Sequence, residues 1–512
     1  MGIPLKQIKS ASSLPPENRS KHAQNPNQTK ASKVLGIISK ALFVAYVVSA
    51  AIINGIIIYL AVLPTKYLTV LLAVSITIGA LLGFFTIKNF SNSNFRYTAR
   101  IACSILSGVL TGIFCLVFIY LNHTMGFMDA IRASGYQIDN YSIIVKDSSP
   151  YKSLDDLEDR TIAIYDGDNS YSEAIKKLQQ KISFKSKNYG SSISAAGALL
   201  NDTTDAIFIK SSLVSVINEI VPEFDIDNLR VIDTIEIRTK VDSATTNLDV
   251  TKDSFNIFIS GIDTYGEIST VSRSDVNMII TINPRTHTIL LTSIPRDYYV
   301  QLHGTTGLKD KLTHAGLYGI NMSINTLQDL FDIQISYYIR VNFDSTINLI
   351  NAIDGIDVVP DLTFSRTTDG IYCYYQEGVV NHLDGFCALR YARERKAYGT
   401  GDKHRIQNQQ QVMMGIIDKL TGSKILLAKY TDILSSMTGT LETNIPSSQI
   451  YKLVNEQLDS MPSWTIERIS ADGEHIDAET FTIPGQYLYV FEPYPESVAE
   501  VSAKIKATME AN

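Results

Sequence analysis

Three long apolar runs dominate the first 122 residues, at positions 41–63, 67–87 and 101–121. None of the three contains a charged residue. A helix needs about 20 apolar residues to cross a bilayer, and buried helices of soluble domains rarely extend so far without a polar face. The pattern therefore predicts three transmembrane helices within 37–122. The polar stretch 1–36 is rich in Ser, Asn, Pro and Gln, which predicts a disordered tail rather than a cleaved signal peptide.

Shorter apolar segments alternate with helical patterns over residues 123–245. Strand-like segments at 141–147, 161–167 and 205–210 are interleaved with helical ones, which predicts a small α/β accessory domain. Its segment "KSLDDLEDRTIAI" faintly resembles extracellular solute-binding domains. Because no catalytic constellation is visible there, we interpret it as an accessory or spacer domain.

A second outer domain is predicted over residues 250–512. The segments "FNIFISGID", "DVNMIITI" and "HTILLTSI" are so apolar that they favour strands covered on both faces. Helical patterns follow at 319–331, 343–353 and 405–420. Together these elements predict an α/β fold, a mixed-sheet α/β/α sandwich.

Charge is distributed unevenly along the chain. Residues 1–122 carry eleven Lys/Arg and one acid, whereas the remainder is strongly acidic and brings the total to −7. Basic residues gather in the tail and in the connection between the second and third runs. The positive-inside rule therefore predicts a cytoplasmic N-terminus in the cell membrane and an extracellular location for residues 123–512. The acidic outer part disfavours nucleic acid as a partner.

Two of the four cysteines, Cys373 and Cys387, lie in the outer part, 14 positions apart. An extracellular location permits a disulfide between them. Spacing alone does not establish the geometry that the bond requires.

The turn "NPRT" (283–286) predicts how two strands pair. If the hairpin closes at this turn, Asp275 faces Ile294 and Arg273 faces Arg296. Asp263 ends the preceding strand and reaches the same edge of the sheet if that strand runs alongside. Two facing arginines repel each other unless an anion lies between them, and guanidinium groups match phosphate oxygens. A phosphate site with Mg²⁺ held by the carboxylates and an internal Arg–Asp salt-bridge network both fit these residues.

The stretch "RYARERKAYGTGDKHRIQNQQQ" (390–411) concentrates positive charge in this acidic part of the chain. Asp402 is a plausible N-cap of the following helix, and Arg405 and Gln409 share one face of it. Arg393, Arg395 and Arg405 are therefore expected to form a second basic wall near a positive helix end. A solvated charged surface is the alternative interpretation.

Several ordered motifs over about 255–420 resemble the LytR-CpsA-Psr family. They are "RSDVNMIITINPRT…LLTSIPRDYYV", "KLTHAGLYG", "YYIRVNFDSTINLINAIDGIDV" and "HLDGFCALRYARER…GDKHRIQNQQQV". The three spans and the accessory domain look like the streptococcal capsule-locus branch of that family.

The resemblance implies a membrane-bound, Mg²⁺-dependent phosphotransferase of the Gram-positive envelope, in which Mn²⁺ is a possible substitute. Such proteins attach a glycopolymer carried on polyprenyl diphosphate to peptidoglycan through a phosphodiester. The resemblance favours capsular polysaccharide over a teichoic acid-like polymer, and other capsule-assembly proteins are possible partners. The lipid tail is expected in an apolar tunnel between the sheet and its helices.

The resemblance also implies residue roles. Asp263 and Asp275 match metal-associated aspartates, Arg296 matches the arginine most closely tied to activity, and Asp297 is an orienting partner or a base. The residues that match diphosphate-binding positions are Arg273, Arg393, Arg395, Arg405 and Gln409. Lys311 lies in a family motif without a clear role, and Arg390 is left out because many members are neutral there.

Two other functions stay open on the sequence. One is hydrolysis of the same diphosphate, with water as the acceptor. The other is a non-enzymatic membrane regulator that acts through protein partners, since the short cytoplasmic tail carries no DNA-binding motif.

Overall fold

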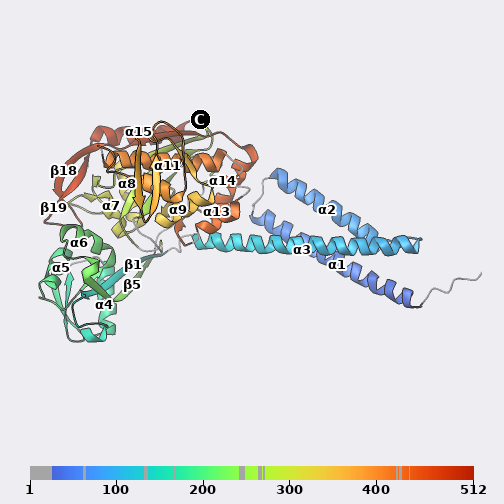
Figure 1. Cartoon of the computed structure of the whole chain (residues 1–512), viewed down its shortest axis with the longest axis horizontal. Coiled ribbons are helices and arrows are strands. Elements are labelled where there is room, and N and C mark those ends of the chain that lie inside the picture. The colour runs from blue at the N-terminus through green and yellow to red at the C-terminus, as the bar shows by residue number, and fades with distance from the viewer. Residues whose placement is uncertain are drawn as a thin grey trace, which may run out of the picture. The chain divides into compact units, whose positions relative to one another are not determined.

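The computed structural model describes residues 26–60, 65–131, 136–165, 169–240, 248–262, 268, 271–399, 401–422, 425, 429–437 and 439–512. The chain divides into an N-terminal helical unit and a larger unit that begins near residue 121, named the outer unit after its predicted location. Figure 1 shows both units with their element labels. Each unit is described separately below.

Three helices form the N-terminal unit: α1 (Pro26–Leu60), α2 (Thr65–Ile87) and α3 (Ser93–Ile131). All three are long and apolar enough to cross a membrane, as the apolar runs predicted. Helix α1 begins at Pro26, so the helix starts about ten residues before the predicted end of the disordered tail. Tyr46, Leu82 and Cys103 pack where the three helices meet, while most other apolar side chains face outward, as expected for lipid-facing surfaces.

The accessory part of the outer unit is a five-stranded mixed sheet in the order β3-β2-β4-β1-β5. One core lies between the sheet and α4, and a second lies between the sheet and α5 with α6. The strands are β1 (Tyr136–Lys146), β2 (Thr161–Tyr165), β3 (Lys185–Tyr189), β4 (Ala206–Lys210) and β5 (Leu229–Lys240). The helices are α4 (Asn169–Lys181), α5 (Ser192–Leu200) and α6 (Val214–Ile220), with short 3₁₀ turns η1 (Asp155–Leu157), η2 (Ser211–Leu213) and η3 (Ile226–Asn228).

The larger part is built on a six-stranded mixed sheet in the order β16-β11-β6-β7-β8-β17. Along β6, Phe258 faces the core formed with α8 and α15, while Ile257 and Ile259 face the core formed with α11 and α14. This alternation buries both faces. The predicted α/β/α sandwich is therefore confirmed, and its central strands are the three apolar segments that predicted it.

The elements of this part are, in chain order, β6 (Phe255–Ile262), β7 (Ser274–Asn283), β8 (Thr288–Ile294), β9 (Tyr299–Val300), β10 (Asp310–Lys311), α7 (Leu312–Ala315), η4 (Gly316–Tyr318), α8 (Ile320–Phe331), β11 (Tyr337–Val341), α9 (Phe343–Ala352), β12 (Ile356–Val358), β13 (Phe364–Thr368) and β14 (Ile371–Tyr375). They continue with β15 (Asn381–Leu383), α10 (Gly385–Arg393), α11 (Asp402–Gly422), α13 (Tyr430–Ser436), β16 (Leu441–Thr443), α14 (Ser447–Ser460), β17 (Thr465–Ser470), β18 (Gly473–Glu479), β19 (Tyr487–Pro493) and α15 (Pro495–Glu510).

Cys373 and Cys387 form a disulfide between β14 and α10. The predicted extracellular location permits this bond, but the spacing of the two cysteines did not establish it. The bond ties the β13–β14 hairpin to the helix that leads into the basic stretch.

The hairpin register differs from the prediction by two residues. Asn283 pairs with Thr288 and Asn277 with Ile294, so the loop is longer than the predicted turn. Arg285 donates its backbone N–H to the Asn283 side chain, and His287 adopts a left-handed φ of 52°. A shift of two residues keeps every side chain on its predicted face, but it moves Asp275 toward Arg296.

The accessory part shares a hydrophobic core with the larger part. Leu317 of η4 and Ile483, which precedes β19, are buried among accessory residues such as Val216 and Phe224. At the same contact, Gly316 packs so closely that an added Cβ would lie 2.6 Å from the Ser272 carbonyl oxygen. The accessory part is therefore packed against η4, and η4 in turn packs against the segment that leads into β7.

We predict that Gly316→Ala destabilises the outer unit by about 1–3 kcal/mol, because the added methyl group meets backbone atoms that have no rotamer to change. Gly197 in α5 has open space around its Cβ position, so Gly197→Ala should be neutral or stabilising by up to about 1 kcal/mol. Trp464, the only tryptophan in the chain, reports thermal unfolding of the outer unit by fluorescence. Equal melting temperatures for the two variants would contradict the close packing at Gly316.

Candidate active site

A β-bulge at the end of the β6–β7 ladder positions Asp275. Gly261 pairs with Val276 and Ile262 pairs with Ser274, so Asp275 is the extra residue between them. The Ser274 carbonyl accepts a hydrogen bond from the Asn277 side chain inside the bulge. Gly261 is required here because a Cβ would lie 2.7 Å from that of Val276. Bulges of this kind re-aim a side chain.

Asp275 and Arg296 form the centre of the site. Arg296 Nη1 lies 3.0 Å from Asp275 Oδ2, and Thr313 donates its hydroxyl to Asp275 Oδ1 at 3.1 Å. Arg296 Nε lies 3.4 Å from Asp297, which in turn lies 3.4 Å from Lys311 Nζ. Lys311 and Thr313, carried by the 310–313 segment, thus hold the two carboxylates around Arg296.

Positive charge surrounds Asp275. Burial alone would raise the pKa of the Asp275 carboxyl, but Arg296, Arg273 and Arg405 together lower it below its ordinary value. Burial also lowers the pKa of Arg405, and Arg296 and Arg395 oppose its charge further. Such fields act only over short distances, so the arginine before β7, the arginine after β8 and one in the first turn of α11 all lie near one carboxylate.

Asp402 links the basic stretch to this cluster. It is the first residue of α11, and its carboxylate lies 2.9 Å from Arg405 and 3.7 Å from Arg395. The predicted N-cap therefore acts instead as an ion-pair partner within the first helical turn. Gln409 follows Arg405 by one turn of α11 and is half-buried.

Arg393 lies over the Phe343 ring at the start of α9, with its Cζ 4.0 Å from the ring centroid. Its position is fixed by the end of α10, which begins at an N-cap where Asp384 accepts from the Cys387 N–H. The sequence does not predict the Arg393–Phe343 contact, because 50 residues separate the partners. Asp263 lies outside the described residues.

The accessory part contributes a residue that the sequence interpretation missed. Glu219 of α6 forms an ion pair with Arg273. Burial lowers the pKa of Arg296, but the charges of Asp275, Asp297, Asp402 and Glu219 together raise it above its ordinary value. Arg273 is only 17% exposed, whereas Glu219 is 53% exposed. The accessory part therefore contributes one acidic side chain to the border of the candidate site.

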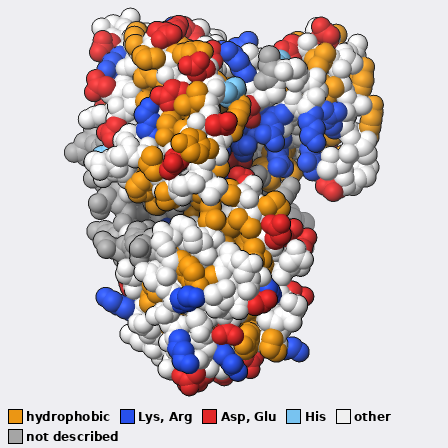
Figure 2. All heavy atoms as spheres, turned by 90° about the vertical axis from the view of Figure 1, so that its left-hand side faces the viewer, with side chains coloured by type: hydrophobic (Ala, Val, Ile, Leu, Met, Phe, Trp, Pro, Cys, Tyr) orange, Lys and Arg blue, Asp and Glu red, His pale blue; other side chains and the backbone are white. Residues whose placement is uncertain are grey.

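Figure 2 shows Lys and Arg side chains gathered around a recess in the upper right of one face of the molecule. Carboxylates border the same recess. This charge pattern is that of a site for a polyanion.

The donor set around Asp275 suits a hard cation that takes few protein ligands. Among the described residues, no group of three or more His, Cys, Asp or Glu side chains is arranged to hold a metal. Mg²⁺ is commonly bound by one or two carboxylates with waters and substrate phosphates completing its shell. Asp275 supplies one carboxylate for that mode, with Oδ2 against Arg296 and Oδ1 against the Thr313 hydroxyl.

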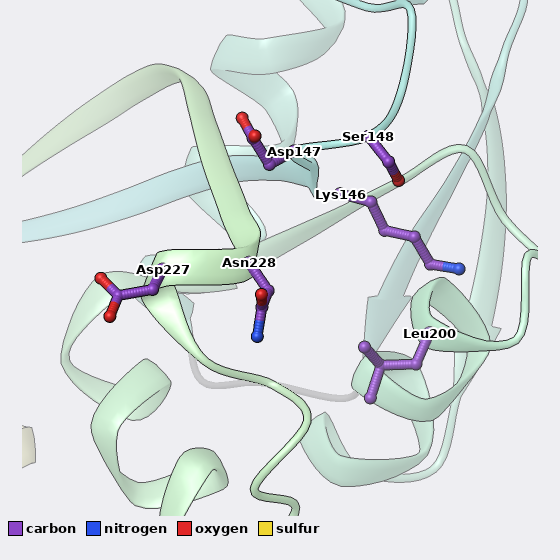
Figure 3. Close-up of a pocket in the computed structure, with 6 residues that line it drawn as sticks. All are labelled: Lys146, Asp147, Ser148, Leu200, Asp227 and Asn228. Carbon is purple, nitrogen blue, oxygen red and sulfur yellow. The ribbon is translucent and has the colours of Figure 1, made fainter.

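A separate pocket of about 350 Å³ lies in the accessory part (Figure 3). It is lined by Lys146, Asp147, Ser148, Leu200, Asp227 and Asn228. Lys146 is ion-paired with Asp202 at 2.7 Å, and Figure 3 shows the Asp227 side chain pointing away from Lys146. The pocket therefore lacks the convergent charges found around Asp275.

Comparison with known proteins agrees with the motifs. The model of the LytR_cpsA_psr family matches residues 229–506. The chain belongs to this family. The family match covers every site residue named above except Glu219.

Two named proteins are similar to part of this chain. The polyisoprenyl-teichoic acid–peptidoglycan teichoic acid transferase TagU of Bacillus anthracis is 35% identical over 219 residues, 43% of this chain and 69% of TagU. TagV of Bacillus subtilis, with the same descriptive name, is 34% identical over 203 residues, 39% of this chain and 51% of TagV.

Solved structures of family proteins also align with the chain. The crystal structure of B. subtilis TagV aligns with a TM-score of 0.44 and 29% identity, over 51% of this chain and 99% of TagV. TagT bound to LIIa-WTA aligns with a TM-score of 0.41 and 26% identity, over 52% of this chain and 95% of TagT.

We predict that Asp275→Asn lowers the melting temperature of the outer unit most at neutral pH. The pKa of Asp275 is lower in the folded protein than in the unfolded chain, where it is about 3.9. The ionised carboxylate therefore stabilises the fold fully above the unfolded pKa, and this stabilisation is lost as pH falls through the folded pKa. The difference between wild type and variant should therefore shrink below about pH 4.

The matched control is Asp369→Asn, because Asp369 pairs with Arg390 but is 75% exposed. Exposed pairs contribute about 0–1 kcal/mol, so this variant should melt close to wild type at every pH. A pH-independent effect of Asp275→Asn would contradict the charge argument.

Proposed function

We propose that this protein is a membrane-anchored glycopolymer transferase that moves a polyprenyl-diphosphate-linked glycan onto peptidoglycan through a phosphodiester. The observation that carries the proposal is the cluster around Asp275: Arg296 lies 3.0 Å from its carboxylate, and the charges of Arg273 and Arg405 lie near enough to lower its pKa. The five basic groups of this cluster outnumber its four carboxylates, and a diphosphate neutralises the excess positive charge. The names of the TagU and TagV relatives support this class of substrate.

The proposed topology follows from charge. The tail lies in the cytoplasm, the three apolar helices cross the cell membrane, and residues 123–512 stand outside. A polyprenyl carrier anchored in the outer leaflet then reaches the site without crossing the bilayer. Capsular polysaccharide is the favoured donor because of the capsule-locus resemblance, whereas the named relatives act on teichoic acid.

The reaction transfers a phosphoryl group that stays attached to the glycan. The acceptor hydroxyl oxygen forms a bond to this phosphorus, and the bond to the bridging oxygen breaks, so that polyprenyl phosphate leaves. Arg296 stabilises the negative charge that develops on the transferring group. Asp297, held by Lys311 and Arg296, orients the acceptor hydroxyl or takes its proton.

The remaining arginines hold the diphosphate before and after transfer. Arg395, between α10 and α11, and Arg405 of α11 share the partner Asp402, and Arg273 approaches from the segment before β7. Arg393 and Gln409 extend the same wall. Asp275, with Asp263, would hold Mg²⁺ or Mn²⁺, and a bound cation would neutralise charge on the phosphate oxygens.

Activity of the full chain in detergent should fall at least about 100-fold in Arg296→Ala. The assay supplies a polyprenyl-diphosphate-linked glycan, Mg²⁺ and peptidoglycan fragments, and follows the phosphodiester product by mass spectrometry. Capsular and teichoic acid-like donors are tested side by side, since the relative rates identify the polymer.

Arg390→Ala is the matched control. Arg390 lies in the same basic stretch but pairs with Asp369 and stacks on Phe386, so its loss should change the rate by no more than a few fold. Release of free phosphate without product would favour the hydrolase alternative. A protein that neither binds nor turns over the lipid would favour the regulator.

Removal of divalent cations with a chelator should abolish transfer, and added Mg²⁺ or Mn²⁺ should restore it. Asp275→Asn should need a higher Mg²⁺ concentration for half-maximal rate, because the remaining amide is a weaker ligand than a carboxylate. Transfer at full rate in excess chelator would disprove the metal requirement.

A further inference from the structure

The hairpin formed by β18 and β19 presents an exposed row of aromatic side chains. In this hairpin His475 pairs with Phe491, Asp477 with Tyr489, and Glu479 with Tyr487. Paired residues and every second residue share one face, so these six side chains lie together. Tyr487 is 73% exposed and Tyr489 is 51% exposed.

On the opposite face of the hairpin, the side chains of β19 pack against the rest of the outer unit. Val490 is fully buried, and Leu488 packs against the core shared with the accessory part. The aromatic face is therefore displayed outward by a hairpin whose other side is anchored. Figure 1 shows β18 and β19 at one edge of the outer unit, on the side that Figure 2 views.

The inner end of the aromatic row adjoins the candidate site. Phe491 donates its backbone N–H to the Asp297 carbonyl at 2.8 Å, and its ring lies 6.1 Å from that of Tyr298. One step outward, Tyr489 stacks on His475 at 4.4 Å and lies in the fields of Asp297 and Asp402. The row therefore runs from Asp297 toward the surface.

Several contacts hold the hairpin rigidly to the segment that builds the site. The buried Asp310 accepts from the backbone and hydroxyl of Thr482 in the hairpin loop. Tyr299 donates to the Glu479 carbonyl at 2.7 Å, and Lys309 pairs with Glu492 at 2.7 Å. A surface fixed at this many points keeps its distance from Asp297 constant.

The charge of the hairpin selects among ligands. Its two strands contain the acids Glu474, Asp477, Glu479 and Glu492 and no Lys or Arg. Two of them, Asp477 and Glu479, lie on the aromatic face, where they would repel a phosphate-rich polymer but not a neutral sugar. Aromatic rings offer apolar faces for the C–H side of a sugar, and the carboxylates accept hydrogen bonds from its hydroxyl and amide groups.

We propose that the aromatic face of the β18–β19 hairpin, with Tyr487 and Tyr489 as its most exposed rings, binds sugar rings of the acceptor glycan strand and directs its hydroxyl toward Asp297. The inference rests on the proposed function for the identity of the acceptor. It adds a subsite for the glycan backbone, separate from the arginines that hold the diphosphate.

The direct test measures binding of a neutral β-1,4-linked N-acetylglucosamine oligomer to the full chain in nanodiscs, without any lipid donor. Tyr487→Ala and Tyr489→Ala should each weaken binding about 5- to 30-fold, as expected for truncation of an aromatic anchor. Tyr489→Phe keeps the ring and should bind within about 2-fold of wild type. Polyglycerol phosphate of similar length should not bind to the hairpin.

Tyr372→Ala is the matched control, because Tyr372 is 63% exposed on a different hairpin, β13–β14. In the transfer assay, the Tyr487→Ala variant should raise the KM for peptidoglycan fragments by a similar factor and leave the KM for the lipid donor unchanged. Since Tyr487 is so exposed, its truncation should leave the melting temperature unchanged.

The outcomes separate this inference from the proposed function. Sugar binding that depends on Tyr487 and Tyr489 in a protein without transfer activity would support the subsite and refute the transferase. Transfer with an acceptor KM unaffected by either tyrosine would refute the subsite and leave the transferase in place. Equal losses in Tyr372→Ala would also overturn the inference.

Discussion

Repulsion among like charges is the constraint on which the outer unit depends. Arg273, Arg296, Arg395 and Arg405 come from distant parts of the chain and meet around the carboxylates of Asp275 and Asp402. Guanidinium groups do not lose their protons, so this arrangement persists only because carboxylates lie between them. The β-bulge at Asp275, the first turn of α11 and the Glu219 contact each place a carboxylate where it separates two arginines.

Much of the fold was predictable because burial leaves a clear trace in the sequence. Strands β6, β7 and β8 are covered on both faces, so their residues are apolar almost without interruption. The exact pairing was not predictable, because a left-handed backbone at His287 lengthens the turn and no residue pattern requires it. The bulge is equally hidden: only the close approach of Gly261 to Val276 indicates that Asp275 is an extra residue.

Some residues of the candidate site were also predictable from the sequence, and others were not. Arginines and aspartates in motifs were predictable as a group because family resemblance marks them. Their partners were not, since Thr313, Asp402 and Glu219 act through contacts between elements that are distant in sequence or carry no distinctive pattern. Glu219 lies in a short helix of the accessory part whose sequence, "VSVINEI", indicates packing alone.

The segment 310–318 connects three features that otherwise look independent. Its start supplies Lys311 to the Asp297 carboxylate, its buried Asp310 fixes the β18–β19 loop, and its end buries Leu317 in the accessory core. A displacement of the accessory part would therefore move Leu317 and, through the same short segment, Lys311 at the candidate site. Rigid connections of this kind transmit position better than flexible loops.

The extent of the shared core also changes what counts as the smallest folding unit. The family match begins at residue 229, which is the first residue of β5. Strand β5 pairs with β1 along its whole length, and β1 lies outside the match. A chain cut at the family boundary would keep one edge strand without its neighbour and would expose Leu317 and Ile483 to water, two features that promote aggregation. The evolutionary module and the physical domain in this protein therefore have different borders.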